Sequence, residues 1–403
     1  MTVVPQQLKW VVDDVIPHTP ALQALMGDVT TLAGRDITAS AIADADILLV
    51  RSITPVNEQL LAKSKVKFIG TATAGVDHLD IEAIERLGIA WSAAPGSNAV
   101  SVAEYVLCAL ATSGWLEPVL AGLPVGLVGL GQVGERLARR LSSLGCQVLA
   151  CDPLRRDWPV DVRRAALDEV LRQPVISLHA NLHEEGAHAS KGMLDADRAE
   201  QMVRALSGRA EGGLFINAGR GDLMTIEALS RLVDSPWTVI LDTWPGEPAL
   251  SSDLLFRCDW VSPHIAGHSM QARENGSDLL AESIASWAGV MAPALSGQYG
   301  KDPAIDDPGI LRFEQGAGDD DAGSWMRQFL IQQSILPRED ARLRAAGRAG
   351  LSSVEFDRLR KTYQQPAEWT GQTVTLSDGD SDFRVAAERL GLTVASEDGS
   401  DDV

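Results

Sequence analysis

The sequence predicts an α/β protein with two Rossmann-like, doubly wound parallel-sheet domains and a small C-terminal α+β domain. Short apolar runs of strand length alternate with helical patterns from residue 8 to residue 290, as in parallel-sheet units. A glycine-rich turn lies in the middle of this series, directly between an apolar run and a helical pattern. Beyond residue 293 the composition shifts to Gly, Asp and Pro, and only short helical and strand-like segments follow.

The composition limits the class of protein and its partners. A chain of 403 residues with 45% apolar content can bury a large core in two or three domains. The formal net charge of −20 would repel nucleic acid and anionic membranes, so neither is expected as a partner. The four cysteines lie in apolar runs without a Cys-x-x-Cys pair, and no apolar stretch reaches the ~18 residues of a membrane span. We therefore expect a soluble, cytoplasmic protein with reduced cysteines.

The first predicted domain begins with alternating strands and helices. Three strands and one helix are expected first, at residues 10–12, 47–50 and 68–71 for the strands and 19–26 for the helix. Arg51 and Ser52 follow the second strand, and Thr73 follows the third. Because ligands of open α/β sheets bind beyond the carboxyl ends of strands, these loops can form an anion site. The alternative, that Ser52 and Thr73 only cap the helices that follow them, stays open.

A buried helix and a linker are predicted before the glycine-rich turn. Residues 99–113 are apolar almost throughout, which is typical of a helix buried between two layers. Residues 114–124 contain Gly and Pro and are predicted as a linker.

The glycine-rich turn has the spacing and the context of a dinucleotide-binding fingerprint. Gly129, Gly131 and Gly134 follow an apolar run and precede a helical pattern at residues 135–141. The first glycine permits a tight turn, the second lets the backbone approach a pyrophosphate, and the third lets the helix pack on the strand. The pyrophosphate would bind the free N–H groups at the start of that helix.

An acidic residue completes the fingerprint and favours one cofactor. Asp152 directly follows the next predicted strand, at residues 147–151. Its carboxylate can accept hydrogen bonds from the ribose hydroxyls of NAD and repel the 2′-phosphate of NADP. Arg155 and Arg156 could receive that phosphate, but Asp152 is the nearer group, so NAD is the predicted cofactor.

The alternation continues to the end of the second predicted domain. Further strands are expected at residues 175–178, 214–217, 239–241 and 260–262. Further helices are expected at residues 167–171, 226–232 (capped by Thr225) and 272–290. His179 and His183 are four residues apart, as metal ligands on a helix can be. They follow a strand and no His-Glu-x-x-His motif is present, so no metal site is predicted.

The C-terminal part is predicted as a small domain without a catalytic motif. Residues 296–323 are predicted as a linker, and residues 396–403 as a frayed acidic end. Between them, helices and one strand are expected at residues 325–330, 354–361 and 383–390 for the helices and 373–376 for the strand.

Three strand ends in the second half each present one polar residue, namely Arg220, Glu247 and His264. Hydride transfer between a 2-hydroxy acid and a nicotinamide needs a base, a partner that orients the base, and a cation for the carboxylate. Histidine suits the first role because it titrates near neutral pH. Glu247 would fix the tautomer of His264, and Arg220 would bind a carboxylate through two hydrogen bonds. Each residue alone has a structural interpretation, but the set at successive strand ends favours catalysis.

Several motifs resemble those of the D-isomer-specific 2-hydroxyacid dehydrogenases. The three catalytic loops carry them, as Asn-Ala-Gly-Arg-Gly at 217–221, Asp-x-Trp-x-Gly-Glu-Pro at 242–248 and His-Ile-Ala-Gly at 264–267. Within that family, further segments resemble a branch that oxidises a phosphorylated four-carbon hydroxy acid in pyridoxal phosphate synthesis, at residues 50–58, 70–78, 92–99 and 355–363.

The resemblance implies a role for each candidate residue. Arg220, Glu247 and His264 would be catalytic, with His264 as the proton donor and acceptor. NAD would contact the glycine turn, the acid and later strand ends, through Gly129, Gly131, Gln132, Val133, Gly134, Asp152, Ala218, Gly219, Arg220, Asp242 and Gly267. The phosphorylated hydroxy acid would contact Arg51, Ser52, Thr73, His268 and, in preference to Arg358, Arg360.

The resemblance also implies the domain boundaries. Residues 1–98 and 264–292 would form a substrate-binding domain, and residues 99–263 an NAD-binding domain that includes a crossover helix. Residues 293–403 would form a dimerisation domain, so a homodimer is expected.

Two departures from the family pattern concern ligand contacts. Where the family has a Thr that can contact the cofactor through its hydroxyl, this chain has Ala180. Where the family has a Tyr that contacts the substrate, this chain has His268, which can still donate a hydrogen bond to a phosphate. Two alternatives stand beside the main hypothesis: oxidation of another D-2-hydroxy acid such as glycerate or phosphoglycerate, and a catalytically inactive NAD-binding sensor or corepressor. The intact catalytic set argues against the sensor, and the C-terminal domain favours the phosphorylated four-carbon acid.

Overall fold

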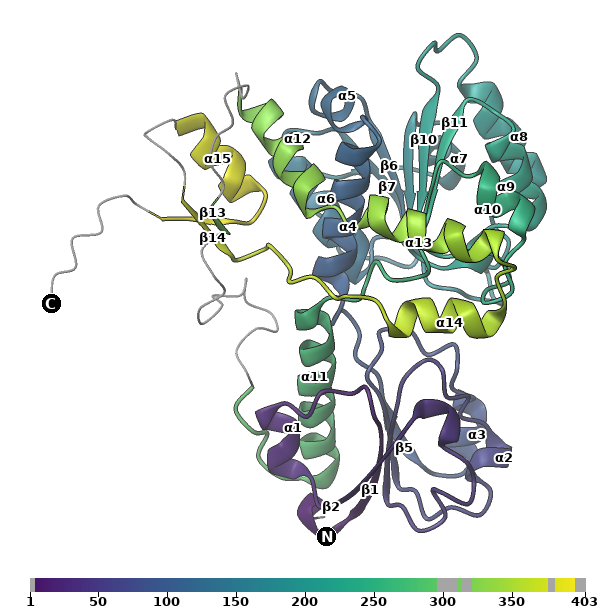
Figure 1. Cartoon of the computed structure of the whole chain (residues 1–403), viewed down its shortest axis with the longest axis vertical. Coiled ribbons are helices and arrows are strands. Elements are labelled where there is room, and N and C mark those ends of the chain that lie inside the picture. The colour runs from purple at the N-terminus through teal and green to yellow at the C-terminus, as the bar shows by residue number, and fades with distance from the viewer. Residues whose placement is uncertain (1–3, 296–310, 313–320, 376–380, 396–403) are drawn as a thin grey trace, which may run out of the picture. The chain divides into compact units, whose positions relative to one another are not determined.

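The computed structural model describes residues 4–295, 311–312, 321–375 and 381–395 of the chain. The chain divides into two compact units, which we call unit 1 (residues 1–98 and 268–305) and unit 2 (residues 99–267 and 306–403). Figure 1 labels the elements of both units. Among the described residues, no helix combines the length and the apolarity needed to cross a membrane.

Unit 1 is built on a parallel five-stranded sheet with strand order β2-β1-β3-β4-β5. Its strands are β1 (Lys9–Asp13), β2 (Asp28–Leu32), β3 (Ile47–Val50), β4 (Phe68–Thr71) and β5 (Ala90–Ser92). The predicted strands at 10–12, 47–50 and 68–71 are confirmed. The two edge strands β2 and β5 were missed because neither contains a buried residue, so no apolar run marks them.

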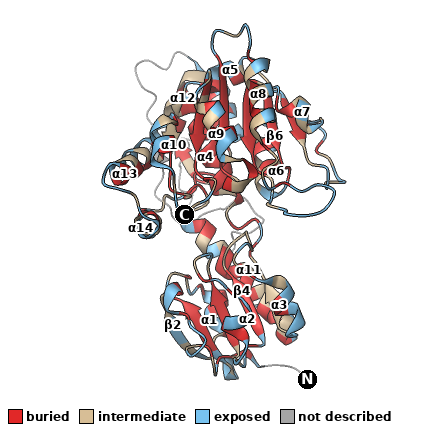
Figure 2. Ribbon diagram, turned by 90° about the vertical axis from the view of Figure 1, so that its right-hand side faces the viewer, coloured by how far each residue is buried: buried red, intermediate tan, exposed pale blue. Residues whose placement is uncertain are grey.

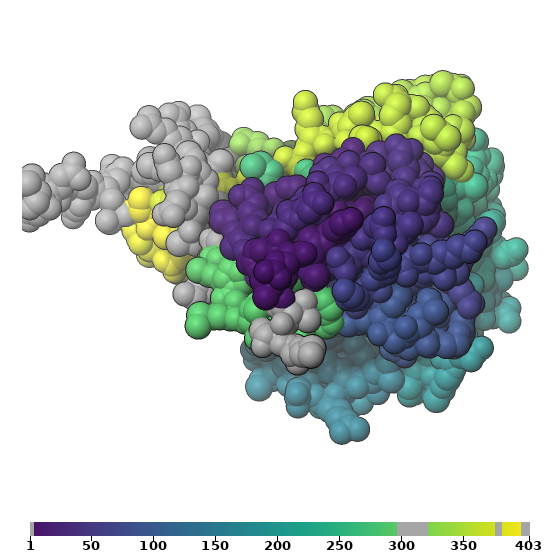
Figure 3. All heavy atoms as spheres, turned by 90° about the horizontal axis from the view of Figure 1, so that it is seen from below, coloured from purple at the N-terminus to yellow at the C-terminus, as the bar shows by residue number. Residues whose placement is uncertain are grey.

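Helices cover both faces of this sheet, and the strands alternate between the two cores. The helices are α1 (Pro20–Leu25), α2 (Glu58–Leu61), α3 (Ile81–Arg86) and α11 (Met270–Ala288). Trp10 and Val12 pack into the cluster that includes α1 and α11, whereas Val11 packs into the cluster that includes α2 and α3. This is the period of two that a strand buried on both faces requires. Atoms of unit 1, coloured purple, form part of the face that Figure 3 shows.

Unit 2 is built on a parallel seven-stranded sheet with strand order β12-β11-β10-β9-β6-β7-β8. Its strands are β6 (Val125–Val128), β7 (Val148–Cys151), β8 (Arg163–Arg164), β9 (Val175–Leu178), β10 (Gly213–Asn217), β11 (Trp237–Leu241) and β12 (Trp260–Val261). From β6 the chain first adds β7 and β8 on one side of the sheet. It then returns to the other side of β6 and adds β9, β10, β11 and β12 in that order. The strand order therefore reverses between β6 and β9, and doubly wound sheets bind ligands beyond the carboxyl ends of the strands at such a switch point.

Two helical layers enclose the sheet of unit 2 (Figure 1), and Figure 2 shows its strands as buried. One layer contains α4 (Ala99–Thr112), α5 (Leu116–Leu120) and α6 (Gln132–Ser143). The other contains α7 (Leu167–Val170), α8 (Ala196–Ala205), α9 (Ile226–Val233) and α10 (Ser252–Arg257). The prediction of a continuous linker at 114–124 is wrong, because Leu116 and Val119 of α5 are buried and hold this segment as a short helix.

The C-terminal segment of unit 2 contributes buried residues to both cores of the same unit. It contains α12 (Ala322–Gln333), α13 (Leu336–Arg348), α14 (Ser353–Lys361), α15 (Ser381–Arg389) and a parallel sheet of β13 (Leu311–Arg312), β14 (Thr373–Thr375) and β15 (Thr393–Val394). The aromatic rings of Trp325 and Phe329 stack with centroids 5.7 Å apart, and Trp369 meets Phe329 edge-on at 5.8 Å. These three side chains share one core with α4.

The predicted C-terminal elements agree with the structure where it describes them. The helices expected at 325–330 and 354–361 lie within α12 and α14, and the helix at 383–390 coincides with most of α15. The strand expected at 373–376 is β14, and its last residue lies outside the described residues. The predicted frayed end and most of the predicted linker at 296–323 also lie outside them. Helix α13 was missed, because its first two turns carry mainly charged residues and no apolar period.

A buried carboxyl joins α4 to the C-terminal segment. Glu104 on α4 accepts hydrogen bonds from the backbone N–H groups of Trp369 (3.2 Å) and Thr370 (2.8 Å). Burial, reinforced by the charge of Glu368, raises the pKa of Glu104 to about 8, although both amides favour the charged form. Burial therefore favours the protonated form of Glu104 in its contact with the segment.

Candidate active site

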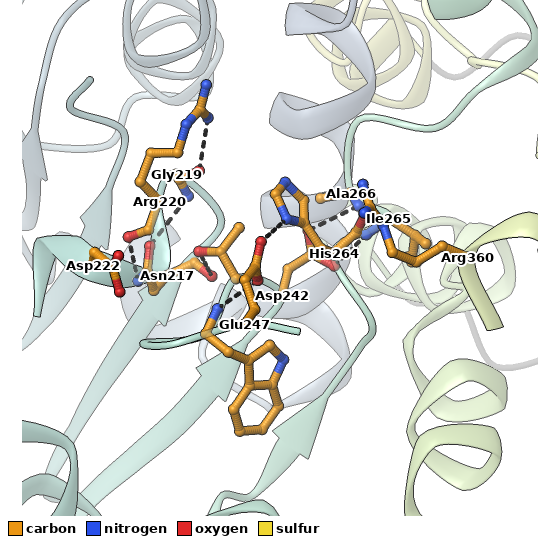
Figure 4. Close-up of polar contacts among 12 residues, drawn as sticks. Asn217, Gly219, Arg220, Asp222, Asp242, Glu247, His264, Ile265, Ala266 and Arg360 are labelled. Atoms are coloured by element: carbon orange, nitrogen blue, oxygen red, sulfur yellow. Dashed lines mark hydrogen bonds and ion pairs between the residues drawn. The ribbon is translucent and has the colours of Figure 1, made fainter. Parts of the chain in front are cut away.

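A histidine and a glutamate are hydrogen-bonded to each other at the carboxyl edge of the unit 2 sheet. His264 follows β12, and Glu247 lies in the loop after the neighbouring strand β11. The Nδ1 atom of His264 contacts the Oε1 atom of Glu247 (Figure 4). The other carboxylate oxygen accepts the backbone N–H of Trp244 at 3.0 Å. The side chains remain 29% and 24% exposed, so the pair is oriented by the protein and still accessible to a small molecule.

The carboxylate of Glu247 stays charged in this pair. Burial favours its neutral form, but the charge and hydrogen bond of His264 outweigh burial and hold the pKa of Glu247 below its usual range. The backbone N–H of Trp244 and the charge of Arg360 act in the same direction. An ionised Glu247 fixes the proton of His264 on Nδ1 and leaves Nε2 to face a substrate.

The backbone of His264 adopts a conformation that non-glycine residues rarely occupy. Its φ is 55°, in the left-handed region, and such strain persists only where surrounding contacts determine the conformation. The buried carboxylate of Asp242 supplies two of these contacts, because it accepts the backbone N–H groups of Ile265 (2.8 Å) and Ala266 (2.9 Å). Arg360 of α14 supplies a third, since its Nε donates to the carbonyl oxygen of His264 at 3.3 Å (Figure 4).

Arg220 follows the next strand along, β10, but its guanidinium points away from the pair of His264 and Glu247 (Figure 4). Its Nη1 donates to the carbonyl oxygen of Gly219 at 3.0 Å. The loop itself is shaped by the buried Asn217, whose side chain accepts the N–H of Gly219 (3.2 Å) and donates to the carbonyl of Arg220 (3.0 Å). The sequence therefore placed Arg220 on the correct sheet edge, and a change of side-chain rotamer would be needed to bring it to the pair.

The glycine turn fits a dinucleotide pyrophosphate. Gly129 has a φ of 91°, and a Cβ there would lie 2.4 Å from the backbone nitrogen of Ala180. A Cβ on Gly134 would lie 2.1 Å from the carbonyl oxygen of Gly129. A Cβ on Gly131 would meet no described atom within 4 Å, so the approach to the N-terminus of α6 is open there. Gly131 is the N-cap and makes no side-chain cap, which leaves the first N–H groups of α6 for an anion.

The loop after β7 favours NAD through a carboxylate and through a restrained arginine. Asp152 accepts the backbone N–H groups of Leu130 (2.8 Å) and Arg155 (3.2 Å) and so holds the two loops together. Arg155 donates to the carbonyl oxygens of Leu130 and Asp157 and forms an ion pair with Glu135 at 2.7 Å. Because all three guanidinium nitrogens of Arg155 already have a partner, Arg155 would have to break at least one of these contacts to bind a 2′-phosphate.

A buried histidine lines the same turn. His179 follows β9, and its Nε2 lies 2.9 Å from the hydroxyl of Ser177. Burial lowers its pKa to about 4, so the ring is neutral and unsuited to anion binding by charge. The Nδ1 atom is buried without a hydrogen-bond partner among the described residues. An orphaned ring nitrogen beside the glycine turn fits a site that a polar cofactor completes.

The other residues expected at the cofactor lie at the same sheet edge, with one difference in role. Ala218, Gly219 and Gly267 belong to the loops after β10 and β12, and Gln132 and Val133 begin α6. Both carboxylate oxygens of Asp242 are used on the loop after β12, with a further hydrogen bond from the hydroxyl of Ser262 at 2.7 Å. The structure thus gives Asp242 a positioning role that the sequence alone did not indicate.

The residues expected at the substrate divide between the units. Arg51, Ser52, Thr73 and His268 belong to unit 1, whereas Arg360 belongs to unit 2. Ser52 and Thr73 are not helix caps, which removes the structural alternative: α2 is capped by Asn57 and α3 by Asp80. The hydroxyl of Thr73 instead donates to the carbonyl of Gly75 at 2.8 Å. Thr225 does cap α9, as expected.

Comparison with known proteins gives a consistent picture. Residues 11–294 match the family model described as D-isomer specific 2-hydroxyacid dehydrogenase, catalytic domain. A protein from Edwardsiella ictaluri named erythronate-4-phosphate dehydrogenase is 36% identical over 379 residues, which are 92% of this chain and 96% of the relative. A protein of the same name from Yersinia enterocolitica is 37% identical over 378 residues, which are 93% and 96%. Because these alignments cover more of the chain than the family model does, they include part of the C-terminal segment.

Solved structures of lower identity share the fold. A protein of Thermus thermophilus, called TT0316, matches with a TM-score of 0.58 at 23% identity, over 71% of this chain and 99% of that one. D-Lactate dehydrogenase from Aquifex aeolicus, complexed with NAD and lactic acid, matches with a TM-score of 0.55 at 21% identity, over 70% and 95%. At these identities the likeness establishes the fold alone, which is the α/β fold predicted from the sequence.

Proposed function

The chain belongs to the D-isomer specific 2-hydroxyacid dehydrogenase family, and on that premise we propose that it oxidises 4-phospho-D-erythronate to 3-hydroxy-2-oxo-4-phosphobutanoate with NAD. The step would serve the synthesis of pyridoxal 5′-phosphate in the cytoplasm. The observation that carries the proposal is the accessible, hydrogen-bonded pair of His264 and Glu247 at the carboxyl edge of a sheet with a dinucleotide-binding glycine turn.

The proposed reaction removes a proton from the C2 hydroxyl and a hydride from C2. NAD, when bound, accepts the hydride. The Nε2 atom of His264 takes the proton, and the ionised Glu247 stabilises the resulting imidazolium through Nδ1. Arg220 binds the substrate carboxylate through two parallel hydrogen bonds after its guanidinium leaves the carbonyl of Gly219.

The identity of the substrate is supported by the relatives and by the C-terminal segment. Proteins named erythronate-4-phosphate dehydrogenase match over 92% or more of the chain, beyond the end of the family model at residue 294. The segment that they share with this chain contributes Arg360, which contacts the carbonyl of His264. An enzyme for glycerate or phosphoglycerate has no such support here. A sensor without activity would not need an ionised glutamate aimed at an accessible histidine.

A substrate panel tests this function. Full-length protein is incubated with NAD and, in turn, 4-phospho-D-erythronate, 3-phospho-D-glycerate and D-glycerate, and NADH is followed by absorbance. We expect kcat/KM to be highest for 4-phospho-D-erythronate. Higher kcat/KM for either of the other acids would replace this substrate, and NADH binding without turnover of any panel member would favour the sensor.

A homodimer is part of the proposal, although the apolar residues of the C-terminal segment do not require one. Trp325 and Phe329 are fully buried within the chain. A partner would therefore have to contact the outer surface of the segment, where Val354 is exposed. Removal of the residues after Ala292 would uncover α4, and we expect aggregation. Light scattering of the full-length protein should give twice the chain mass of 43.1 kDa, and a single chain mass at micromolar concentration would contradict the dimer.

A further inference from the structure

Unit 1 contains two arginines from different elements, Arg51 and Arg273, that contact the end of β1 and the loop after it. Only Arg51 was predicted from the sequence. We propose that Arg273 joins Arg51 in an anion site that binds the phosphate group of the substrate. The identity of the ligand rests on the function proposed above, whereas the existence of an anion site does not. Arg273 lies in the first turn of α11 and Arg51 directly after β3, so they are 222 positions apart in the sequence.

Both arginines are fixed to the loop that follows β1. The Nε atom of Arg51 donates to the Oδ1 atom of Asp13 at 2.8 Å, and Asp13 is the last residue of β1. The Nη2 atom of Arg273 donates to the carbonyl oxygen of Val15, two residues further on. Because β1 and β3 are parallel neighbours, this loop and Arg51 lie at the carboxyl edge of the sheet, where α/β sheets bind ligands.

Two partly buried guanidinium groups lie near one fully buried carboxylate. Asp13 is the buried carboxylate, its Oδ1 binds Arg51, and its Oδ2 has no hydrogen-bond partner among the described residues. This second oxygen therefore accepts no hydrogen bond from Arg273. Burial, together with the charge of Arg51, lowers the pKa of Arg273, while Asp13 and the exposed Glu274 act against this shift. Two guanidinium groups that repel each other across one carboxylate are stabilised by an added anion.

The geometry leaves donors for that anion. Arg51 is 25% exposed, and its two terminal nitrogens make no hydrogen bond to the part of the chain that the structure describes. Guanidinium groups bind phosphate oxygens through forked, charge-assisted hydrogen bonds. A phosphate dianion matches two arginines better than a carboxylate does, since it carries more charge and a third acceptor oxygen. Ser52 is exposed next to Arg51 and adds a hydroxyl donor.

A purely structural role is the competing interpretation for Arg273. Its bond to Val15 and the bond from the hydroxyl of Ser277 to the carbonyl of Pro17 (2.7 Å) both attach α11 to the loop after β1. Loss of a structural attachment would lower the melting temperature and affect all substrates alike. Loss of a phosphate ligand would act on phosphorylated compounds selectively, so selectivity separates the two roles.

The test compares phosphorylated and unphosphorylated ligands. The variants are Arg273→Gln, Arg273→Lys and Arg51→Gln, with Arg86→Gln as control, because Arg86 is an exposed arginine of the same unit paired with Glu58. The readouts are the ratio of kcat/KM for 4-phospho-D-erythronate to that for D-erythronate, and the inhibition constant of inorganic phosphate. We expect Arg273→Gln to lower the ratio by about 10- to 100-fold, as for loss of a charge-assisted hydrogen bond, with a smaller loss for Arg273→Lys.

A second measurement keeps the inference testable if the substrate assignment fails. Inorganic phosphate should raise the melting temperature of the wild-type protein and of Arg86→Gln, and should raise it less in Arg273→Lys and Arg51→Gln. If wild type oxidises no panel substrate but these shifts are found, the proposed function is wrong and the anion site stands. If wild type is active, the ratio is unchanged in Arg273→Gln and Arg273→Lys, and the thermal shift is unchanged in Arg273→Lys and Arg51→Gln, the anion site is wrong and the function stands.

Discussion

The glycine turn and the loop after β12 lie at the same edge of the unit 2 sheet, and in each an aspartate accepts backbone N–H groups. The two loops differ in how they obtain a backbone with positive φ. Asp152 accepts backbone N–H groups of the glycine turn and of its own loop, and Asp242 accepts those of Ile265 and Ala266 in the loop after β12. The glycine turn obtains its unusual backbone from Gly129, which tolerates positive φ without cost. The loop after β12 imposes a positive φ on His264, a residue that resists it.

The difference shows what each loop is for. A turn that must let a pyrophosphate approach needs an absence of side chains, and glycine supplies this locally. A loop that must present an imidazole needs the side chain and its orientation together. It therefore depends on contacts from elsewhere in the chain, namely Asp242, Glu247 and Arg360. Substitutions in the glycine turn should consequently impair cofactor binding, whereas substitutions in the loop after β12 should impair turnover.

The largest effect is expected for His264→Ala. Removal of the general base should lower turnover by about 10²–10⁴-fold, while NADH binding persists because the glycine turn and Asp152 lie in other loops. Steady-state turnover and fluorescence titration with NADH measure the two quantities. A variant that loses NADH binding together with turnover would show that the two loops are not separable.

A matched pair of aspartate variants should separate the loops further. In Asp242→Asn the amide would place a donor against a backbone N–H, and we expect kcat to fall by roughly 10- to 100-fold from the lost buried hydrogen bonds. In Asp152→Asn we expect the KM for NAD to rise with a smaller change in kcat. For each variant, kcat and the KM values for NAD and for 4-phospho-D-erythronate are measured. Equal changes of kcat in the two variants would contradict the positioning role of Asp242.

Glu247→Gln should remove the charge and keep the shape of the pair. We expect turnover to fall by roughly 10-fold near neutral pH, because a neutral amide stabilises the imidazolium less. The pKa of Glu247 is below the usual value when folded, so its charge contributes stability above the ordinary glutamate pKa. That contribution is lost as pH falls through the lowered pKa. Melting temperatures of wild type and variant should therefore converge on acidification, and a constant difference down to that range would contradict the ion pair.

Arg360 and Arg358 offer a comparison within one helix. Arg360 contacts the carbonyl of His264, whereas Arg358 pairs with Glu355 on the surface of α14. We expect Arg360→Gln to lower kcat by about 3- to 10-fold through loss of one supporting hydrogen bond, and Arg358→Gln to leave it within twofold. Separate measurement of kcat and KM distinguishes this positioning role from direct binding of the substrate phosphate, which would raise KM instead.

The smallest effect concerns cofactor choice. Arg139 and Arg155 outweigh burial and hold the pKa of Glu135 below its usual range, so Glu135 stays charged and restrains Arg155. Glu135→Gln should release Arg155 towards a 2′-phosphate and narrow the preference for NAD over NADP by about 3- to 10-fold. Arg139→Gln removes the exposed partner of Glu135 and serves as control. Binding constants for both cofactors provide the readout, and an unchanged preference would assign the selectivity to Asp152 alone.

The contrast between features set by neighbouring residues and features set by distant residues also explains which elements could be predicted from the sequence. Local rules predicted the buried strands β3, β9 and β10 and the glycine turn, because apolar period and glycine spacing report on neighbours along the chain. They missed α8 and α13, whose exposed polar faces hide the pattern, and the helix α5 in the predicted linker. These three helices are stabilised by packing against segments that are distant in the sequence.

The site shows the same division. The residue types Arg220, Glu247 and His264 at strand ends indicated the chemistry, and their motifs indicated the family. The role of Asp242 in holding the loop, the attachment of Arg273 to Val15 and the restraint of Arg155 all depend on pairings remote in sequence. A weak signal for Arg273 existed, since it is a cation in the first turn of a helix, where acids are the usual choice.

Chemical rescue of His264→Ala tests the central claim, that an oriented imidazole removes the hydroxyl proton, most directly. NADH formation from 4-phospho-D-erythronate is measured with increasing imidazole in the variant, in wild type and in Asp242→Asn. We predict that imidazole restores turnover in His264→Ala, more strongly as pH rises and the added base becomes neutral, and that it does not stimulate the other two proteins. Turnover in His264→Ala that is close to wild type without imidazole, or equal stimulation of all three proteins, would contradict the account.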